Sequence, residues 1–255
     1  MNAPTAITSR DNPLLKRVRL LAQDSTAYRK QGQVWLEGDH LCRALLARGH
    51  RPATAVFSET FWPQAPHDLR DAADHIVTVP DALMAGISGL ESPAGVGFVW
   101  DLPKAAALQA GAASVVLDRL QDAGNVGSIL RSAAAMGFAQ VLALKGTAAL
   151  WSPKVLRAGM GAHFGLHLVE GLSVDDLSGL VVPLLVTSSH QGDFLHKARL
   201  PWPCAWVLGH EGQGVSTALE ALAAQTVRIV QPGGEESLNV AAAAAICLHA
   251  SAAGR

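Results

Sequence analysis

Three polar turns in the second half of the sequence carry side chains suited to ligand binding and group transfer. The first turn contains Asn125 and Arg131. The second is rich in glycine and holds a single carboxylate, Glu211. The third presents Ser237 and Asn239 directly before a long alanine-rich segment. An asparagine and an arginine beside a helix start suit a phosphate or a ribose, because helix N-termini attract anions.

Each of these turns follows an apolar segment that the sequence predicts to be a strand. The three predicted strands are residues 114–117, 205–208 and 226–230. Ligands of parallel sheets favour the edge at which the strands end, so we expect the turns to form one site. A serine and an asparagine before a helix are by themselves most often only a cap. The two similar turns upstream favour the functional interpretation.

Helical periodicity follows the first and third turns. Apolar residues after the first turn recur at the spacing of one core-facing helix side: Val126, Ile129, Leu130 and Ala133. We expect Asn125 to be the N-cap of this helix, which ends near Met136, and Arg131 to lie off its core-facing side. Ser237 or Asn239 is placed to cap the helix that follows the third turn.

Strands and helices alternate through the second half of the chain. Further strands are predicted at 140–144, 166–169 and 181–187, and helices at 153–158, 174–177 and 216–223. This alternation is typical of an α/β fold with a mostly parallel sheet and helices on both faces. The first half is predicted to be a smaller α/β unit. We expect an N-terminal domain at 1–102, a linker at 103–113 and a second domain at 114–255.

Composition and charge narrow the class of protein. The chain has 255 residues, of which 49% are hydrophobic and 16% charged, as in globular proteins. Its formal net charge of −1 gives no overall attraction to nucleic acid, so a local basic patch must provide any such contact. Three widely separated cysteines match no zinc-ligand spacing, and we expect no metal. No apolar run of about 18 residues and no signal-peptide pattern occur, which predicts a cytoplasmic protein without membrane contact.

Motifs of several other enzyme classes are missing. Gly209, Gly212 and Gly214 do not have the Gly-x-Gly-x-x-Gly spacing of dinucleotide-binding folds. The sequence has no P-loop, no Gly-x-Ser-x-Gly elbow and no His-Glu-x-x-His motif. A nicotinamide-dependent oxidoreductase is therefore the weakest of the functions considered.

Basic residues gather near the start of the chain. The candidates for phosphate contact are Arg10, Lys16, Arg17, Arg29 and Lys30. Composition alone gives equal weight to a solvated helix face and to a phosphate-binding patch, and both interpretations stay open.

Taken together, the three turns resemble the motifs of the SpoU/TrmH family of SPOUT RNA methyltransferases. The family motifs correspond in order and spacing to Asn125, Gly127 and Arg131, then to Gly209, Glu211, Gly212 and Gly214, and then to residues 237–240. The resemblance covers residues 114 to 249. The N-terminal half more loosely resembles the substrate-binding domain of ribosomal-RNA members. Ala123 stands where the family usually has proline, and Val230 and Gln231 stand where it has proline and methionine.

The resemblance implies a fold, a cofactor and a set of site residues. Similar proteins have a deep trefoil knot, dimerise through the knotted domain, and carry an N-terminal domain like ribosomal protein L30e. Residues that match the S-adenosylmethionine site are Thr187, Leu208, Gly209, Gly212, Ile229 and Leu238. Residues that match the catalytic set are Asn125, Arg131, Glu211, Ser237 and Asn239. The five basic residues near the N-terminus would contact RNA, and no metal is implied.

The implied function is methylation of a ribose 2′-hydroxyl in structured RNA, with ribosomal RNA preferred over transfer RNA. Three alternatives remain: methylation of a base, ribose methylation of transfer RNA, and a non-catalytic RNA-binding factor of ribosome assembly. Whether Arg131 acts as a base or as a phosphate clamp also stays open, because a guanidinium is almost always protonated.

Overall fold

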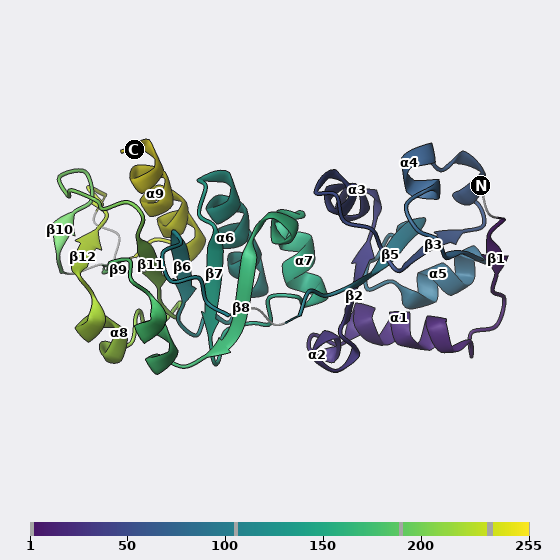
Figure 1. Ribbon diagram of the computed structural model, residues 1–255, viewed down its shortest axis with the longest axis horizontal. Coiled ribbons are helices and arrows are strands. Elements are labelled where there is room, and N and C mark those ends of the chain that lie inside the picture. Colours follow the sequence, from purple (N-terminus) through teal and green to yellow (C-terminus); the bar gives the residue numbers. More distant parts are fainter. Residues whose placement is uncertain (1–2, 105–106, 189–190, 234–236, 255) are drawn as a thin grey trace. The chain divides into compact units, whose positions relative to one another are not determined.

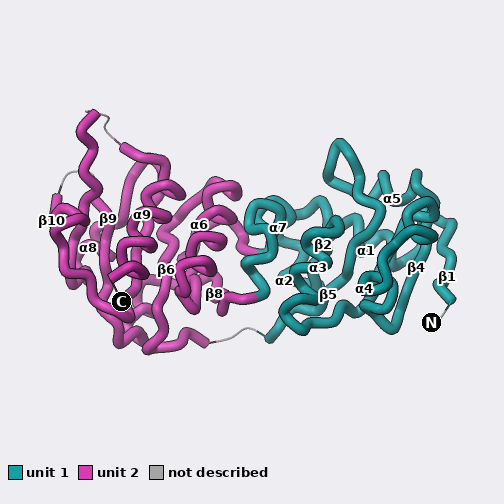
Figure 2. Tube along the Cα trace, turned by 90° about the horizontal axis from the view of Figure 1, so that it is seen from above, with its two compact units in different colours: residues 1–104, 151–164 teal, residues 105–150, 165–255 magenta. Residues whose placement is uncertain are grey.

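The computed structural model describes residues 3–104, 107–188, 191–233 and 237–254. It divides into two compact units, shown in teal and magenta in Figure 2. Unit 1 comprises residues 1–104 and 151–164, and unit 2 comprises residues 105–150 and 165–255.

The sheet of unit 1 has five strands of mixed direction (Figure 1). Across the sheet they are β1 (Thr5–Ala6), β4 (Ile76–Val79), β3 (Thr54–Ser58), β5 (Val96–Asp101) and β2 (Gln33–Glu37). β4 runs parallel to β1 and β3, whereas β5 runs antiparallel to β3 and β2. The helices are α1 (Pro13–Gln23), α2 (Ala27–Gln31), α3 (Asp39–Ala47), α4 (His67–Arg70), α5 (Asp81–Ile87) and α7 (Pro153–Gly159), with the 3-10 helices η1 (Trp62–Gln64) and η2 (Ala162–Gly165).

Residues 151–164 belong to unit 1 although they are distant from the rest of that unit in sequence. The ring of Trp100, on β5, lies 5.7 Å from that of Trp151 and 5.5 Å from that of Phe164, measured between centroids. All three side chains are buried. Aromatic packing of this kind is a large apolar contribution, which explains why the segment folds with unit 1. The domain boundaries expected from sequence remain a prediction.

The sheet of unit 2 has seven strands, and every neighbouring pair is parallel. Across the sheet they are β10 (Asp193–Phe194), β12 (Gln225–Arg228), β9 (Leu184–Thr187), β11 (Ala205–Leu208), β6 (Ser114–Leu117), β7 (Gln140–Leu144) and β8 (His167–Leu172). The helices are α6 (Ala123–Ala135), α8 (Thr217–Leu222) and α9 (Val240–Ala253), with the 3-10 helix η3 (Asp175–Gly179). The expected α/β class with a parallel sheet is confirmed.

Helices cover both faces of this sheet because neighbouring strand residues point in opposite directions. Trp206 of β11 is fully buried, and its indole Nε1 donates a hydrogen bond of 2.9 Å to the hydroxyl of Ser251 on α9. The next residue, Val207, packs on the other face with Leu177 of η3 and Leu219 of α8. Helix α6 packs beside α9 (Figure 1).

The N-cap of α6 differs from the prediction. The helix begins at Ala123, and its N-cap is Asp122, whose Oδ1 accepts a 2.7 Å hydrogen bond from the backbone N–H of Asn125. A carboxylate satisfies this free N–H and also interacts favourably with the positive end of the helix dipole. Asn125 therefore lies inside the first turn, and its side chain is available for other contacts. At α9 the prediction is confirmed, because Asn239 is the N-cap.

Three predicted elements of unit 2 also differ in extent or type. The strand predicted at 181–187 begins only at Leu184, and Val181 is 80% exposed. Pro183 directly precedes it and has no N–H to donate to a neighbouring strand. The strand predicted at 226–230 is β12, which ends at Arg228. The helix predicted at 174–177 is the 3-10 helix η3.

Candidate active site

The predicted polar turns meet at the edge of the unit 2 sheet where its strands end. The first two turns follow the neighbouring strands β6 and β11, and the N–H of Asp118 donates to the carbonyl of Leu208 at 2.9 Å. The second turn, the end of β9 and the chain before α9 surround a pocket of about 590 Å³. This volume is typical of small-molecule sites.

Most of the predicted cofactor residues line this pocket: Thr187, Gly209, Gly212, Ile229 and Leu238. Leu208 is the exception, because its side chain is fully buried and does not line the pocket. Three predicted catalytic residues, Glu211, Ser237 and Asn239, also line it. Lining residues that the sequence did not single out include Ser188, Gln213, Val215, Val227 and Ala243, and Gln231, which departs from the family motif, lines the pocket as well.

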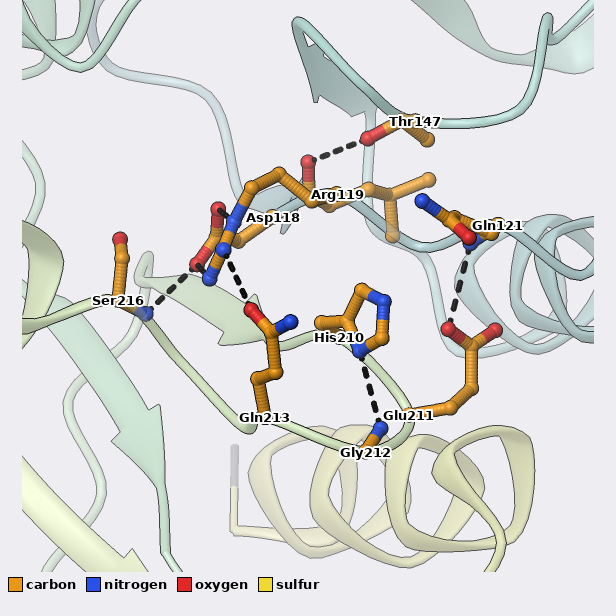
Figure 3. A network of polar contacts seen from close by, with 10 residues as sticks. Asp118, Arg119, Gln121, Thr147, His210, Glu211, Gly212, Gln213 and Ser216 are labelled. Carbon is orange, nitrogen blue, oxygen red and sulfur yellow. Dashed lines mark hydrogen bonds and ion pairs between the residues drawn. The ribbon is translucent and has the colours of Figure 1, made fainter.

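The carboxylate of Glu211 joins the second turn to the first. Its Oε1 accepts hydrogen bonds from the N–H of Asp122 at 3.1 Å and from Nδ2 of Asn125 at 3.3 Å. Its Oε2 accepts from the N–H of Gln121 at 3.3 Å, a contact drawn in Figure 3. Burial alone would raise the pKa of Glu211, but hydrogen bonds from these N–H groups and from its own N–H outweigh it, and the pKa lies below its usual value. Glu211 is therefore ionised at neutral pH and holds the start of α6.

A second contact joins the first turn to the third. Asn239 Nδ2 donates to Oδ1 of Asn125 at 3.0 Å, across 114 residues of sequence. The Oδ1 of Asn239 accepts from the N–H groups of Ala241 and Ala242 at the start of α9. Asn239, Asn125 and Glu211 thus form one chain of hydrogen bonds that ties the three turns together. The sequence placed these residues in one site but did not predict that they bond to one another.

Asp118 and Arg119 hold the other side of the second turn, and the sequence did not single them out (Figure 3). The Asp118 side chain is 3% exposed, and it accepts from Arg119 Nε at 2.9 Å and from the N–H of Ser216 at 2.7 Å. Arg119 also donates to the side chain of Gln213 at 3.0 Å. Burial alone would raise the pKa of Asp118, but the Arg119 and Ser216 hydrogen bonds outweigh it and lower the pKa. The sequence feature that could have identified them is a charged pair directly after a predicted strand.

The glycines of the second turn have different structural reasons. A Cβ on Gly209 would lie 2.2 Å from backbone atoms of Gly214 and Val215, so the turn packs against itself there. Gly214 has φ +70°, which other residues rarely adopt. A Cβ on Gly212 would meet only the ring of His210, at 3.9 Å. At Gly209 it is therefore the backbone of the same turn, at Gly214 and Val215, that leaves no room for a side chain.

Arg131 stands apart from these contacts. It lies on α6, is exposed and does not line the pocket. In the part of the chain that the structure describes, no hydrogen bond or ion pair involves its guanidinium. Its five donors are therefore available to a substrate.

The basic residues predicted to contact RNA are exposed in unit 1: Arg10, Lys16, Arg17, Arg29 and Lys30. Lys16 forms an ion pair with Asp11 at 3.0 Å, and Arg29 donates to the hydroxyl of Tyr28 at 3.2 Å. The described residues contain no group of His, Cys, Asp and Glu that could hold a metal ion. Among the same residues, no helix is long and apolar enough to cross a membrane.

Comparison with known proteins gives the class. The model of the SpoU rRNA Methylase family matches residues 112–249, which is more than half of the chain. The chain therefore belongs to the SpoU rRNA methylase family, as the three turns indicated, and it is an RNA methyltransferase.

Individual relatives agree with this assignment. An uncharacterized tRNA/rRNA methyltransferase of Synechocystis sp. is 33% identical and covers 96% of this chain and 92% of its own. The 23S rRNA (guanosine(2553)-2′-O)-methyltransferase RlmP of Bacillus subtilis is 31% identical, covering 84% of this chain and 86% of its own. The AdoMet-bound rRNA methyltransferase of Sinorhizobium meliloti shares the fold, with 24% identity, a TM-score of 0.83 and 97% of each chain covered.

Proposed function

We propose that this protein uses S-adenosylmethionine to methylate a ribose 2′-hydroxyl of ribosomal RNA. The observation that carries the proposal is that the second and third family motifs line one pocket, and that Asn125 of the first motif is joined by hydrogen bonds to Glu211 and Asn239 on that lining. The ribose 2′-oxygen is the methylated atom in the name of the Bacillus subtilis relative. The preference for ribosomal RNA agrees with the family and with that relative.

The pocket fits S-adenosylmethionine in chemistry as well as in size. Ile229, Leu238 and Val215 offer apolar surface, and the glycine-rich second turn exposes backbone groups to the ligand. Glu211 and Glu220 place carboxylates on the lining, which suits a cationic ligand. When bound, the cofactor supplies a methyl group already activated by a sulfonium. The Sinorhizobium meliloti enzyme of the same fold has this cofactor bound.

The residues of the site then act mainly by positioning. Glu211, Asn125 and Asn239 fix the three turns, while Ser237 lies on the pocket lining with its hydroxyl next to the incoming ribose. Arg131 grips the adjacent phosphate bidentately and stabilises the negative charge that develops on the 2′-oxygen. The 2′-oxygen would take the methyl group as its hydroxyl proton passes to water, leaving the cofactor as the thioether. A guanidinium is a poor proton acceptor, which favours the clamp over the base.

The remaining expectations belong to the same proposal. We infer a deep trefoil knot within residues 114–255 from the resemblance to the family, and Asn239 bonds back to Asn125 of the first turn. We also infer an L30e-like substrate-binding domain at 1–102, joined through residues 103–113. Its exposed basic residues bind the RNA. The protein forms a homodimer through the knotted domain and works in the cytoplasm, where ribosomal RNA is found.

Calorimetric titration with S-adenosylmethionine, followed by methyl transfer to unmodified ribosomal RNA, tests this function. We expect cofactor binding and a product whose modified linkage resists alkali, since a 2′-O-methyl group blocks attack by the 2′-oxygen. Methylated RNA with an alkali-sensitive linkage would identify a base methyltransferase instead. If only transfer RNA were methylated, the substrate would be transfer RNA and not ribosomal RNA. A folded protein that binds RNA but no cofactor, even with RNA present, would be a non-catalytic assembly factor.

A further inference from the structure

Two cationic side chains and a histidine gather around one aromatic ring at the β10 edge of the unit 2 sheet. We call Phe194, His196, Lys197 and Arg228 the Phe194 cluster. The guanidinium carbon of Arg228 lies 4.0 Å from the centroid of the Phe194 ring, and Lys197 Nζ lies 6.0 Å from it. The imidazole ring of His196 is 5.7 Å away, tilted by 32°. β10 and β12, which carry Phe194 and Arg228, are neighbouring strands at one end of the sheet (Figure 1).

The positive charge of the Phe194 cluster is not balanced. Among the described residues, neither Lys197 nor Arg228 forms an ion pair with a carboxylate. The nearby carboxylate of Asp193 instead accepts from the side chain of Gln225, at 3.5 Å. Two cations on one ring repel each other, and cation–π attraction to a single ring offsets this only in part.

Arg228 also has hydrogen-bonding capacity to spare. Its Nε is buried and has no acceptor in the described part of the chain. Stacking on Phe194 fixes the plane of the guanidinium, so its remaining donors point in a defined direction before any ligand arrives. An ordered guanidinium with an exposed ammonium beside it is well suited to a phosphate.

Arg228 of the Phe194 cluster lies, in sequence, between two residues of the proposed cofactor pocket. Val227 and Ile229, which line the pocket, are the sequence neighbours of Arg228. Ser188, also on the lining, donates its N–H to the carbonyl of Val227 at 3.0 Å. RNA carries a phosphate at every nucleotide, so a strand with one ribose at the pocket presents further phosphates on either side of it.

We propose that the Phe194 cluster binds a backbone phosphate of the substrate RNA beside the reacting nucleotide. This inference rests on the proposed RNA methylation and adds an RNA contact on the catalytic unit itself. Arg228 and Lys197 supply the charge-assisted hydrogen bonds, and Phe194 orients Arg228. Phosphate contacts position the strand and carry no sequence information, so this surface serves register and affinity.

Filter binding to an unmodified 23S ribosomal RNA transcript over a series of KCl concentrations tests the proposal. We expect the double variant Lys197→Gln, Arg228→Gln to bind about tenfold more weakly at low salt. Its plot of log affinity against log salt should be shallower by roughly 0.7 to 0.9, the contribution of one phosphate contact. Its affinity for S-adenosylmethionine should stay within about twofold of the wild type. Lys197→Gln alone, at an exposed position, gives a smaller change of the same sign and guards against misfolding.

Lys145→Gln is the matched control, because it removes one charge at the end of β7, near the other end of the sheet. Three strands separate β7 from β12, a distance of roughly 19 Å. Lys145 also interacts with the carboxylate of Asp176.

An equal loss of RNA affinity in this control would overturn the proposal, as would unchanged affinity and slope in the double variant of an active enzyme. A parallel loss of cofactor affinity would overturn it too, since the Phe194 cluster would then act through the pocket. Absence of methylation by the wild type would count against the proposed function alone.

Discussion

At the residue scale, the site separates side chains that hold the protein together from side chains left for a substrate. Glu211, Asn125 and Asn239 use their polar atoms on one another and on backbone N–H groups. Arg131 is exposed and makes no such contact among the described residues. Residues of one sequence motif set therefore have different roles, and the two roles predict different effects of substitution.

Arg131→Ala should remove activity without removing stability. We expect kcat to fall by at least about 100-fold, the usual loss when a donor to a developing charge is deleted. The unfolding temperature should stay within about 1 °C of the wild type, because surface substitutions without partners change stability little. Methyl-transfer kinetics and calorimetric unfolding measure both quantities. Glu211→Gln is the comparison, and we expect it to lower the unfolding temperature. Equal destabilisation by both variants would contradict the division of roles.

Asp118→Asn should destabilise the protein in a pH-dependent way. An amide keeps only one acceptor oxygen and no charge, so it cannot replace the bonds of both carboxylate oxygens, and we expect a loss of about 1 to 3 kcal/mol at pH 7. The pKa of Asp118 is lowered in the folded state, so its carboxylate stabilises the fold above its unfolded pKa of about 3.9. That contribution is lost as pH falls through the folded pKa. Urea unfolding at pH 7, 5 and 3.5 should show the gap between variant and wild type narrowing at the lowest pH. A constant gap would show that the charge of Asp118 is not responsible.

At the element scale, close packing and side-chain hydrogen bonds hold the second turn in one conformation beside the pocket. Gly209 packs against the backbone of Gly214 and Val215, and the Asp118–Arg119 pair holds Gln213 and Ser216. Its shape is therefore set before a ligand binds, which lowers the entropic cost of binding.

A pair of glycine substitutions tests this description of the turn. Gly209→Ala should abolish S-adenosylmethionine binding, because its Cβ would lie 2.2 Å from the backbone of Gly214 and Val215, and the turn must rearrange. Gly212→Ala should keep the unfolding temperature, since its Cβ meets only the His210 ring at 3.9 Å. Any loss of affinity in Gly212→Ala would then report contact with the cofactor itself. Calorimetric titration of both variants gives the answer, and tight binding by Gly209→Ala would refute the packed turn.

At the scale of the whole molecule, each of the two units is made of two segments that are separate in sequence. Residues 151–164 lie within the span of the family match, 112–249, yet they pack in unit 1 around Trp100. We therefore expect a substitution that destabilises unit 1 to destabilise this segment as well.

Hydrogen exchange of the full chain can test this assignment. We expect Trp100→Ala to lower amide protection in α7 together with β2 and β5, since removal of a buried tryptophan costs about 3 to 5 kcal/mol. Protection in β6 and β11 should stay unchanged. Trp206→Ala, in the core of unit 2, is the matched control and should have the reverse pattern. If α7 lost protection with Trp206→Ala instead, the segment would belong to unit 2.

The sequence by itself determined the class of fold and the family, and it predicted the site residues, most of which the structure brings to one edge of the sheet. Short apolar segments identified the strands β6, β7 and β11, and a periodicity of 3.6 residues identified the helix α6, because local patterns reflect which sides of an element are buried. The three turns identified the family, because their residue types and spacing depend little on the rest of the chain. Local rules also identified Asn239 as a cap, but they chose Asn125 over Asp122, since both are good caps three residues apart.

Only the tertiary structure decided how the site is held together and which segments fold with which unit. The contacts of Asn125 with Asn239, of Glu211 with the start of α6 and of Arg119 with Gln213 join residues about 90 to 114 positions apart. The packing of Trp100 with Trp151 and the gathering of cations around Phe194 are likewise side-chain contacts between separate elements. No local pattern encodes such pairs, because each depends on strand order in the sheet, and strand order is fixed by burial summed over the whole domain.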